Sequence, residues 1–138
     1  MARNIILAVT AIAVAAILIW RFALQPAPQE MAGAPLVEVT VPDLSGEASA
    51  GEALFNAKCA SCHGKNAAGQ DGVAPPLVHI IYEPNHHGDA AFHLAAQRGV
   101  RAHHWPFGDM PAVKSVDGED IDKIVAYVRA LQRANGIH

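Results

Sequence analysis

A C-x-x-C-H pentapeptide, running from Cys59 to His63, constrains this chain more than any other feature of its sequence. Two thiols one helical turn apart can each add to a vinyl group of haem, and the imidazole of the next residue then points at the iron from the same side.

A C-x-x-C pair also occurs in zinc sites and redox dithiols. A closed zinc site needs four ligands, however, and the sequence holds no second cysteine pair. A thioredoxin-like dithiol follows a strand of a βαβ unit, which this region does not indicate. The adjacent histidine therefore favours one haem c, attached through Cys59 and Cys62, with His63 as a ligand of its iron.

The N-terminus carries an uncharged apolar run over residues 5–20. Counted through Leu24 as a helix, the apolar stretch reaches about 30 Å, which matches the hydrocarbon core of a bilayer. We therefore predict that residues 1–24 form a single transmembrane helix that anchors the chain. The alternatives are a cleaved signal peptide, although Pro35 follows the best cleavage sequence at residues 32–34, and a buried helix of a globular domain. The first two interpretations send the rest of the chain across the membrane, and we expect it on the periplasmic side of the inner (cytoplasmic) membrane.

Residues 25–45 hold four prolines with small and acidic residues between them, a composition typical of a semi-stiff tether. One segment within it, Leu36 to Val41, alternates apolar and polar residues. This alternation predicts a short strand if a sheet edge is offered. The sequence thus divides into an anchor over 1–24, a tether over 25–45 and a folded domain over 46–138.

The pentapeptide and its surroundings resemble the class I cytochromes c over about residues 46 to 135. The resemblance implies an all-α domain with the cytochrome c fold around one haem. Gly51 and Phe55 match the glycine and aromatic of the family's N-terminal helix, where the glycine lets the C-terminal helix cross closely. Tyr127 matches the aromatic that packs against that helix.

The helices after the pentapeptide have recognisable starts and ends. We expect the last one to begin at Asp117 as N-cap and to end before Gly136. A middle helix should begin with Asp89 as N-cap, run to Arg98 and stop at Gly99. Their apolar faces comprise Ile121, Ile124, Val125, Val128 and Leu131 in the last helix, and Phe92, Ala95 and Ala96 in the middle one.

The resemblance also implies roles for three residues around the haem. Pro75, or its neighbour Pro76, should accept a hydrogen bond from Nδ1 of the axial His63, which leaves Nε2 for the iron. Met110, before Pro111, looks like the family's methionine ligand and is the only methionine of residues 46–138. A His/Met pair gives a comparatively high potential and leaves no open coordination position. Trp105 should reach a haem propionate through its indole N–H.

The chain contains eight histidines, and two pairs of them, His86-His87 and His103-His104, stand out. Three interpretations remain open at this point. In the first, the histidines are polar loop residues that bond to haem propionates or to water. In the second, they bind a second metal ion, for which copper is the expected choice. In the third interpretation, His103 or His104 exchanges with Met110 as a ligand of the haem iron.

These observations predict a one-electron carrier of a respiratory or photosynthetic membrane chain, and not an enzyme. One alternative is a fixed haem subunit of a terminal oxidase or reductase. The other is a protein that uses the histidine-rich loop to handle haem or copper, or to act as a sensor. The expected partners are the membrane and donor and acceptor redox proteins, with no small-molecule substrate. A net charge of −3 argues against binding to nucleic acid, because no basic field is available to hold a polyanion.

Overall fold

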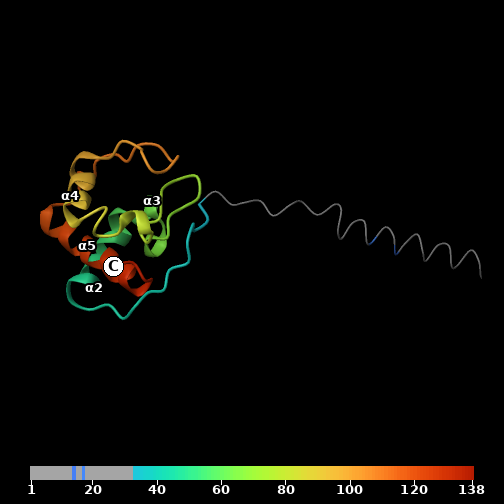
Figure 1. Cartoon of the computed structure of the whole chain (residues 1–138), viewed down its shortest axis with the longest axis horizontal. Helices are drawn as coiled ribbons and strands as arrows, with labels where there is room; N and C mark the ends of the chain where they lie inside the picture. Colours follow the sequence, from blue (N-terminus) through green and yellow to red (C-terminus); the bar gives the residue numbers. More distant parts are fainter. Residues whose placement is uncertain (1–13, 15–16, 18–32) are drawn as a thin grey trace, which may run out of the picture. The chain divides into compact units, whose positions relative to one another are not determined.

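The structure is a computed structural model that describes residues 14, 17 and 33–138 (Figure 1). The chain divides into two compact units, Met1–Glu30 and Met31–His138. The predicted anchor over residues 1–24 and the first part of the predicted tether lie outside the described residues. Within the part of the chain that is described, no helix has the length and apolar character needed to cross a bilayer.

Two helices that are far apart in the sequence of the second unit pack together and form its core. Helix α2, Gly46–Lys58, lies against helix α5, Gly118–Ala134 (Figure 1). They approach closely at Gly51, where a Cβ atom would stand only 1.8 Å from the carbonyl oxygen of Lys123. One turn later the rings of Phe55 and Tyr127 meet with their centroids 5.4 Å apart, and both side chains are fully buried. The predicted helix pair and its glycine are confirmed.

Helix α5 is built as the sequence predicts. The Asp117 carboxylate accepts a hydrogen bond from the Asp120 backbone N–H at 2.9 Å, which satisfies an otherwise free donor of the first turn. The chain leaves the helix through Gly136, whose φ of 78° favours glycine. The predicted apolar stripe is buried throughout, at Ile121, Ile124, Val125, Val128 and Leu131.

Helix α4, Asp89–Arg98, matches the predicted middle helix, but its start differs from the prediction. The N-cap is Gly88, and no side chain caps the helix. Asp89 instead accepts a hydrogen bond from Nε of Arg129 on α5 at 2.8 Å. The prediction of Asp89 as N-cap is therefore wrong, because a charged partner from α5 offers this carboxylate a stronger bond than a backbone N–H.

Residues 33–45 differ from the free tether that the prolines suggest. The backbone N–H groups of Leu36 and Val37 donate to the carbonyl oxygen of Ala68. Further along, Thr40 exchanges two hydrogen bonds with the Asn135 side chain, at 2.9 and 2.8 Å. The predicted strand within Leu36–Val41 does not form, because the surrounding domain is helical and offers it no sheet edge. This segment packs on the domain instead.

The remaining elements are short and surround the pentapeptide. Helix α3, Ala60–His63, contains most of the motif, and two 3-10 turns follow, η1 at Lys65–Ala67 and η2 at Ile80–Tyr82. Residues 33–138 contain only isolated β-bridges, Gln70 with Ala74 and Val100 with Met110. The all-α class is confirmed for the described residues.

Candidate haem-binding pocket

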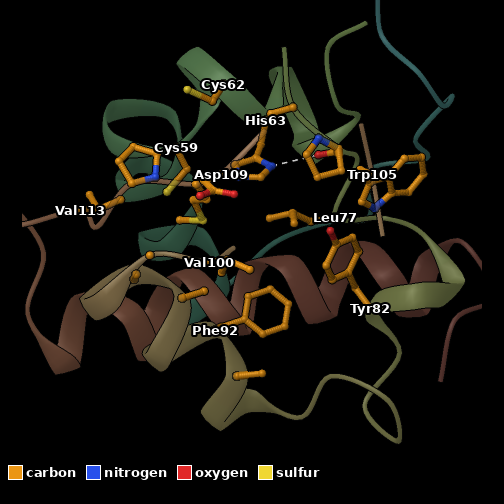
Figure 2. A pocket seen from close by; sticks show the side chains of 18 of the residues that line it. Cys59, Cys62, His63, Leu77, Tyr82, Phe92, Val100, Trp105, Asp109 and Val113 are labelled. Atoms are coloured by element: carbon orange, nitrogen blue, oxygen red, sulfur yellow. Dashed lines mark hydrogen bonds between the residues drawn. The ribbon is translucent and has the colours of Figure 1, made fainter. Parts of the chain in front are cut away.

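A pocket of about 520 Å³ opens between the pentapeptide, helix α4 and the segment that leads to Met110 (Figure 2). Its volume lies within the range typical of cofactor sites, and apolar side chains dominate its walls. All of the residues predicted to bind the cofactor line it: Cys59, Cys62, His63, Pro75, Trp105 and Met110.

His63 is held in the orientation that an axial ligand needs. It is only 9% exposed, and its Nδ1 lies 2.9 Å from the carbonyl oxygen of Pro75 (Figure 2). Because a carbonyl can only accept, Nδ1 carries the proton and Nε2 keeps its lone pair. Burial lowers the pKa of His63 despite the opposing effect of the bond to Pro75, so the neutral imidazole is favoured. The expected hydrogen bond is thus made by Pro75 and not by Pro76.

The two cysteines are free thiols, and both line the pocket. Cys59 is half-buried and Cys62 is exposed. Burial and the neighbouring Cys62 raise the pKa of Cys59 to about 11, so it is a neutral thiol near neutral pH. A thiol is the form whose S–H adds across a vinyl group.

Gln70 supports the pentapeptide, and sequence reasoning missed it. Its Nε2 donates to the backbone carbonyls of Ala60, Ser61 and Cys62 at 3.2, 2.8 and 3.0 Å. The Ala60 carbonyl also accepts from the Gly64 N–H at 3.0 Å, but the Ser61 and Cys62 carbonyls lie in a helix of one turn, too short to supply them with a backbone partner. Gln70 therefore fixes the turn that carries both thiols. No local spacing signals this role, since a glutamine after a glycine is common in any loop.

Met110 is positioned by its own backbone. Its N–H and C=O form a pair of 2.9 Å hydrogen bonds with Val100, which closes the intervening loop. Asp109 adds a bond to the Ala102 N–H at 2.8 Å. Gly99, with φ of 77°, makes room for this closure, because a Cβ there would lie 2.5 Å from the carbonyl oxygen of Met110. The thioether thus reaches the pocket from a loop whose ends are tied together.

Trp105 provides the test of whether this pocket fits a haem. Its Nε1 is buried and makes no complete hydrogen bond, although a contact with the Tyr82 hydroxyl lowers the pKa of Tyr82 against the larger, raising effect of burial. Its ring stacks on Phe107 at a centroid distance of 5.9 Å. A buried N–H without an acceptor costs about 1–3 kcal/mol, so a native site is expected to supply one. A haem propionate is a suitable acceptor at the edge of this pocket. Together with the two thiols and the free Nε2 of His63, this donor fits a covalently attached haem.

Arg129 is a second residue that the sequence analysis missed. It is 7% exposed on α5 and donates to the Asp89 carboxylate and to the backbone carbonyls of Tyr82 and His87. It therefore ties α4 and the loop that follows η2 to the core helix. Its place beside the apolar stripe, four residues after Val125, is the signal that could have revealed its burial.

Two of the histidines have ordinary polar roles. His79 accepts a hydrogen bond from the Ile81 N–H at 3.2 Å, and His93 lies 2.9 Å from the Asp122 carboxylate. These two fit the interpretation of polar surface residues. The pairs His86-His87 and His103-His104 differ from these two, because their rings lie against one another.

Comparison with known proteins agrees with this geometry. The family model described as Cytochrome c matches residues 48–132. Cytochrome c-554(547) of Halothiobacillus neapolitanus is 49% identical over 39 residues, which are 28% of this chain and 42% of that relative. This alignment covers less than half of the relative's length. The family match extends over most of the sequence and includes the pentapeptide, so the chain belongs to the cytochrome c family, a family of haem-based electron carriers.

Proposed function

We propose that this protein is a one-electron carrier with a single haem c, attached through Cys59 and Cys62 and ligated by His63 and Met110. The observation that carries the proposal is the pocket that gathers these four side chains together with the buried Nε1 of Trp105, which makes no complete hydrogen bond within the protein. When bound, the haem iron supplies one-electron exchange between its ferrous and ferric states.

The protein residues would hold this cofactor and exclude competing chemistry. His63 presents a neutral Nε2, and Met110 presents a thioether on a loop closed by its bonds to Val100. Two protein ligands leave no open position for oxygen or peroxide, which favours electron transfer over catalysis. Both ligands are uncharged and tied to backbone partners, so their positions should change little between the two oxidation states.

The proposed setting is the periplasmic face of the inner membrane. The apolar run over residues 5–20 supports an N-terminal anchor, and the proposed partners are donor and acceptor redox proteins in the same membrane. An anchored carrier gains effective concentration from the membrane and needs less long-range electrostatic steering. The net charge of −3, with only ten basic residues in the sequence, fits partners that are not selected through a strongly basic surface.

A fixed haem subunit of a larger oxidase or reductase is the second candidate, and one observation favours it. Residues 33–45 pack on the haem domain and do not form the free tether that a mobile carrier would use. Purification of the detergent-solubilised protein separates the two candidates, because a carrier is expected to purify alone and a subunit with its complex.

The test of the proposed site combines mass and spectrum. The mass of the mature protein should equal the chain plus one haem, and cleavage of the leader would show in the same measurement. Oxidised Met110→Ala should lose the methionine-to-iron charge-transfer band, whereas Met31→Ala, which changes a methionine of the predicted tether, should keep it. A mature chain without haem would refute the cofactor, and an unchanged band in Met110→Ala would refute the sixth ligand.

A further inference from the structure

Two histidine pairs that are distant in sequence meet beside the haem pocket. The rings of His86 and His104 lie with centroids 5.4 Å apart, and those of His87 and His104 lie 5.3 Å apart. His87 and His104 also line the pocket itself. The ligand atoms of these three histidines all lie within 4.8 Å of one another. We propose that His86, His87 and His104 bind one divalent transition-metal ion, copper(II) most tightly, in a site separate from the haem iron.

The spacing of the nitrogens fits a shared ion. Imidazole nitrogens bind zinc at about 2.0–2.1 Å, so two of them around one tetrahedral ion stand about 3.3 Å apart. Nε2 of His86 and Nε2 of His104 are 3.5 Å apart. The third ligand atom lies within 4.8 Å of both, a separation that small side-chain rotations can reduce. Little rearrangement is therefore needed to complete a site with three ligands.

The His87 ring has the support that metal-binding histidines usually have. Its Nδ1 donates to the carbonyl oxygen of Ile81 at 2.6 Å, which fixes the tautomer and leaves Nε2 as the ligand atom. The backbone carbonyl of His87 is in turn held by the buried guanidinium of Arg129. The loop with His86 and His87 is thus tied to α5, and the site is largely organised before a metal arrives.

The donor set selects the class of ion. Imidazole nitrogens suit zinc, copper and nickel, whereas calcium and magnesium prefer oxygen ligands. Among first-row divalent ions, affinity for nitrogen sites generally peaks at copper(II). Water would complete the coordination, because His86 and His104 are exposed. The site goes beyond the proposed electron carrier and does not depend on Met110 as a ligand.

His103 supplies a matched control. It is exposed like His104, and its ring packs against that of His104 with centroids 4.2 Å apart. Its Nδ1, however, bonds to the carbonyl oxygen of Arg101 at 2.8 Å, and it lies outside the set of three. His93 is a second control, because it lies on α4, pairs with Asp122 and is not one of the three proposed ligands.

The test uses the oxidised, haem-loaded protein without a histidine tag, because haem attachment consumes the two thiols that would otherwise bind copper. Equilibrium dialysis against copper sulfate, followed by elemental analysis, should give one copper per chain. Electron paramagnetic resonance of the bound copper should show nitrogen hyperfine splitting. His86→Ala and His104→Ala should each weaken binding at least tenfold, whereas His103→Ala and His93→Gln should change it less than threefold.

Three results would overturn the assignment. One is copper content below 0.1 per chain at micromolar free copper. The second is unchanged binding in both His86→Ala and His104→Ala. The third is an equal loss in His103→Ala, which would show that the histidines attract copper without forming this site. The haem absorption spectrum of each variant confirms that the domain is folded, and copper content per chain is read independently of the haem ligands.

Discussion

The α2–α5 helix pair and the loop from Val100 to Met110 stand at opposite extremes within the same small domain. The helix pair is buried and dry, with Gly51 against the Lys123 backbone and Phe55 against Tyr127. The loop is mostly exposed and is closed by one pair of backbone bonds. Each region holds one buried polar side-chain group without a complete hydrogen bond, Nε1 of Trp105 in the loop and the hydroxyl of Tyr127 in the helix pair, but only Trp105 lines the pocket, where a bound group could supply an acceptor.

This difference shows how the domain separates stability from function. Apolar burial and a close backbone approach give the helix pair its stability, and Phe55, Ile121 and Ile124 add only an apolar surface to the pocket wall. The loop holds Trp105, Met110 and two histidines at one side of the pocket, so its side chains are available to a ligand. Substitutions in the helix pair should therefore affect folding, and substitutions in the loop should affect what the protein binds.

The largest effect is expected at the helix crossing. Gly51→Ala would place a methyl group 1.8 Å from the Lys123 carbonyl oxygen and force the helices apart. We expect a loss of about 3 kcal/mol in the free energy of unfolding, or failure to obtain haem-loaded protein, because overpacking against backbone cannot relax locally. Urea unfolding of purified protein measures it.

Gly118→Ala is the control for this prediction, since nothing lies within 4 Å of a Cβ at that position. It should change the free energy of unfolding by less than about 0.5 kcal/mol. Equal effects of the two substitutions would show that the helix crossing is not specially tight.

Arg129→Met tests the link between the two regions. The substitution leaves the His87 carbonyl and the Gln132 side-chain oxygen without this donor and removes one of the two donors to the Tyr82 carbonyl, so we expect a loss of about 2–3 kcal/mol. Copper binding should weaken as well, because the loop with His86 and His87 is no longer held. Arg133→Met, at an exposed position of the same helix, is the matched control. A stable variant with full copper affinity would contradict the proposed role of Arg129.

Trp105→Phe tests the loop directly. If Nε1 of Trp105 donates to a propionate, its removal should destabilise the haem-loaded protein by about 2 kcal/mol, the usual value of a hydrogen bond to a charged group. Thermal and urea unfolding followed by the haem absorbance provide the measurement. A variant that is more stable than the parent would show that the indole N–H is unpartnered in the haem-loaded protein too.

Tyr127→Phe gives the smallest expected effect and the sharpest contrast with Trp105. The Tyr127 hydroxyl is also buried without a partner, and burial with the nearby Glu52 raises its pKa to about 12. It lies in the helix pair and not on the pocket wall, so no cofactor should satisfy it. Removing the hydroxyl should therefore change stability by less than about 1 kcal/mol, towards greater stability. A large loss in the urea midpoint would show that this hydroxyl has a partner in solution.

The same two regions show what sequence reasoning can reach. The helix pair can be predicted from local sequence signals. Each signal involves residues that are close together in the sequence: the Asp117 cap, the apolar stripe of α5, and Gly51 four residues before Phe55. Asp89 was placed wrongly because its partner, Arg129, is 40 residues away. The meeting of His86 with His104 depends on how two loops pack, which no periodicity describes. Predictions from local pattern therefore succeed in the helices and fail where distant polar groups select one another.

We propose that Met110 and His63 hold a haem iron that exchanges one electron. A potentiometric titration of the haem-loaded protein and of Met110→Ala tests this ligand pair. We expect a single one-electron transition in the parent and a clearly lower midpoint potential in the variant, because a thioether ligand stabilises the reduced iron. An unchanged potential in Met110→Ala, or a transition that does not fit one electron, would contradict it.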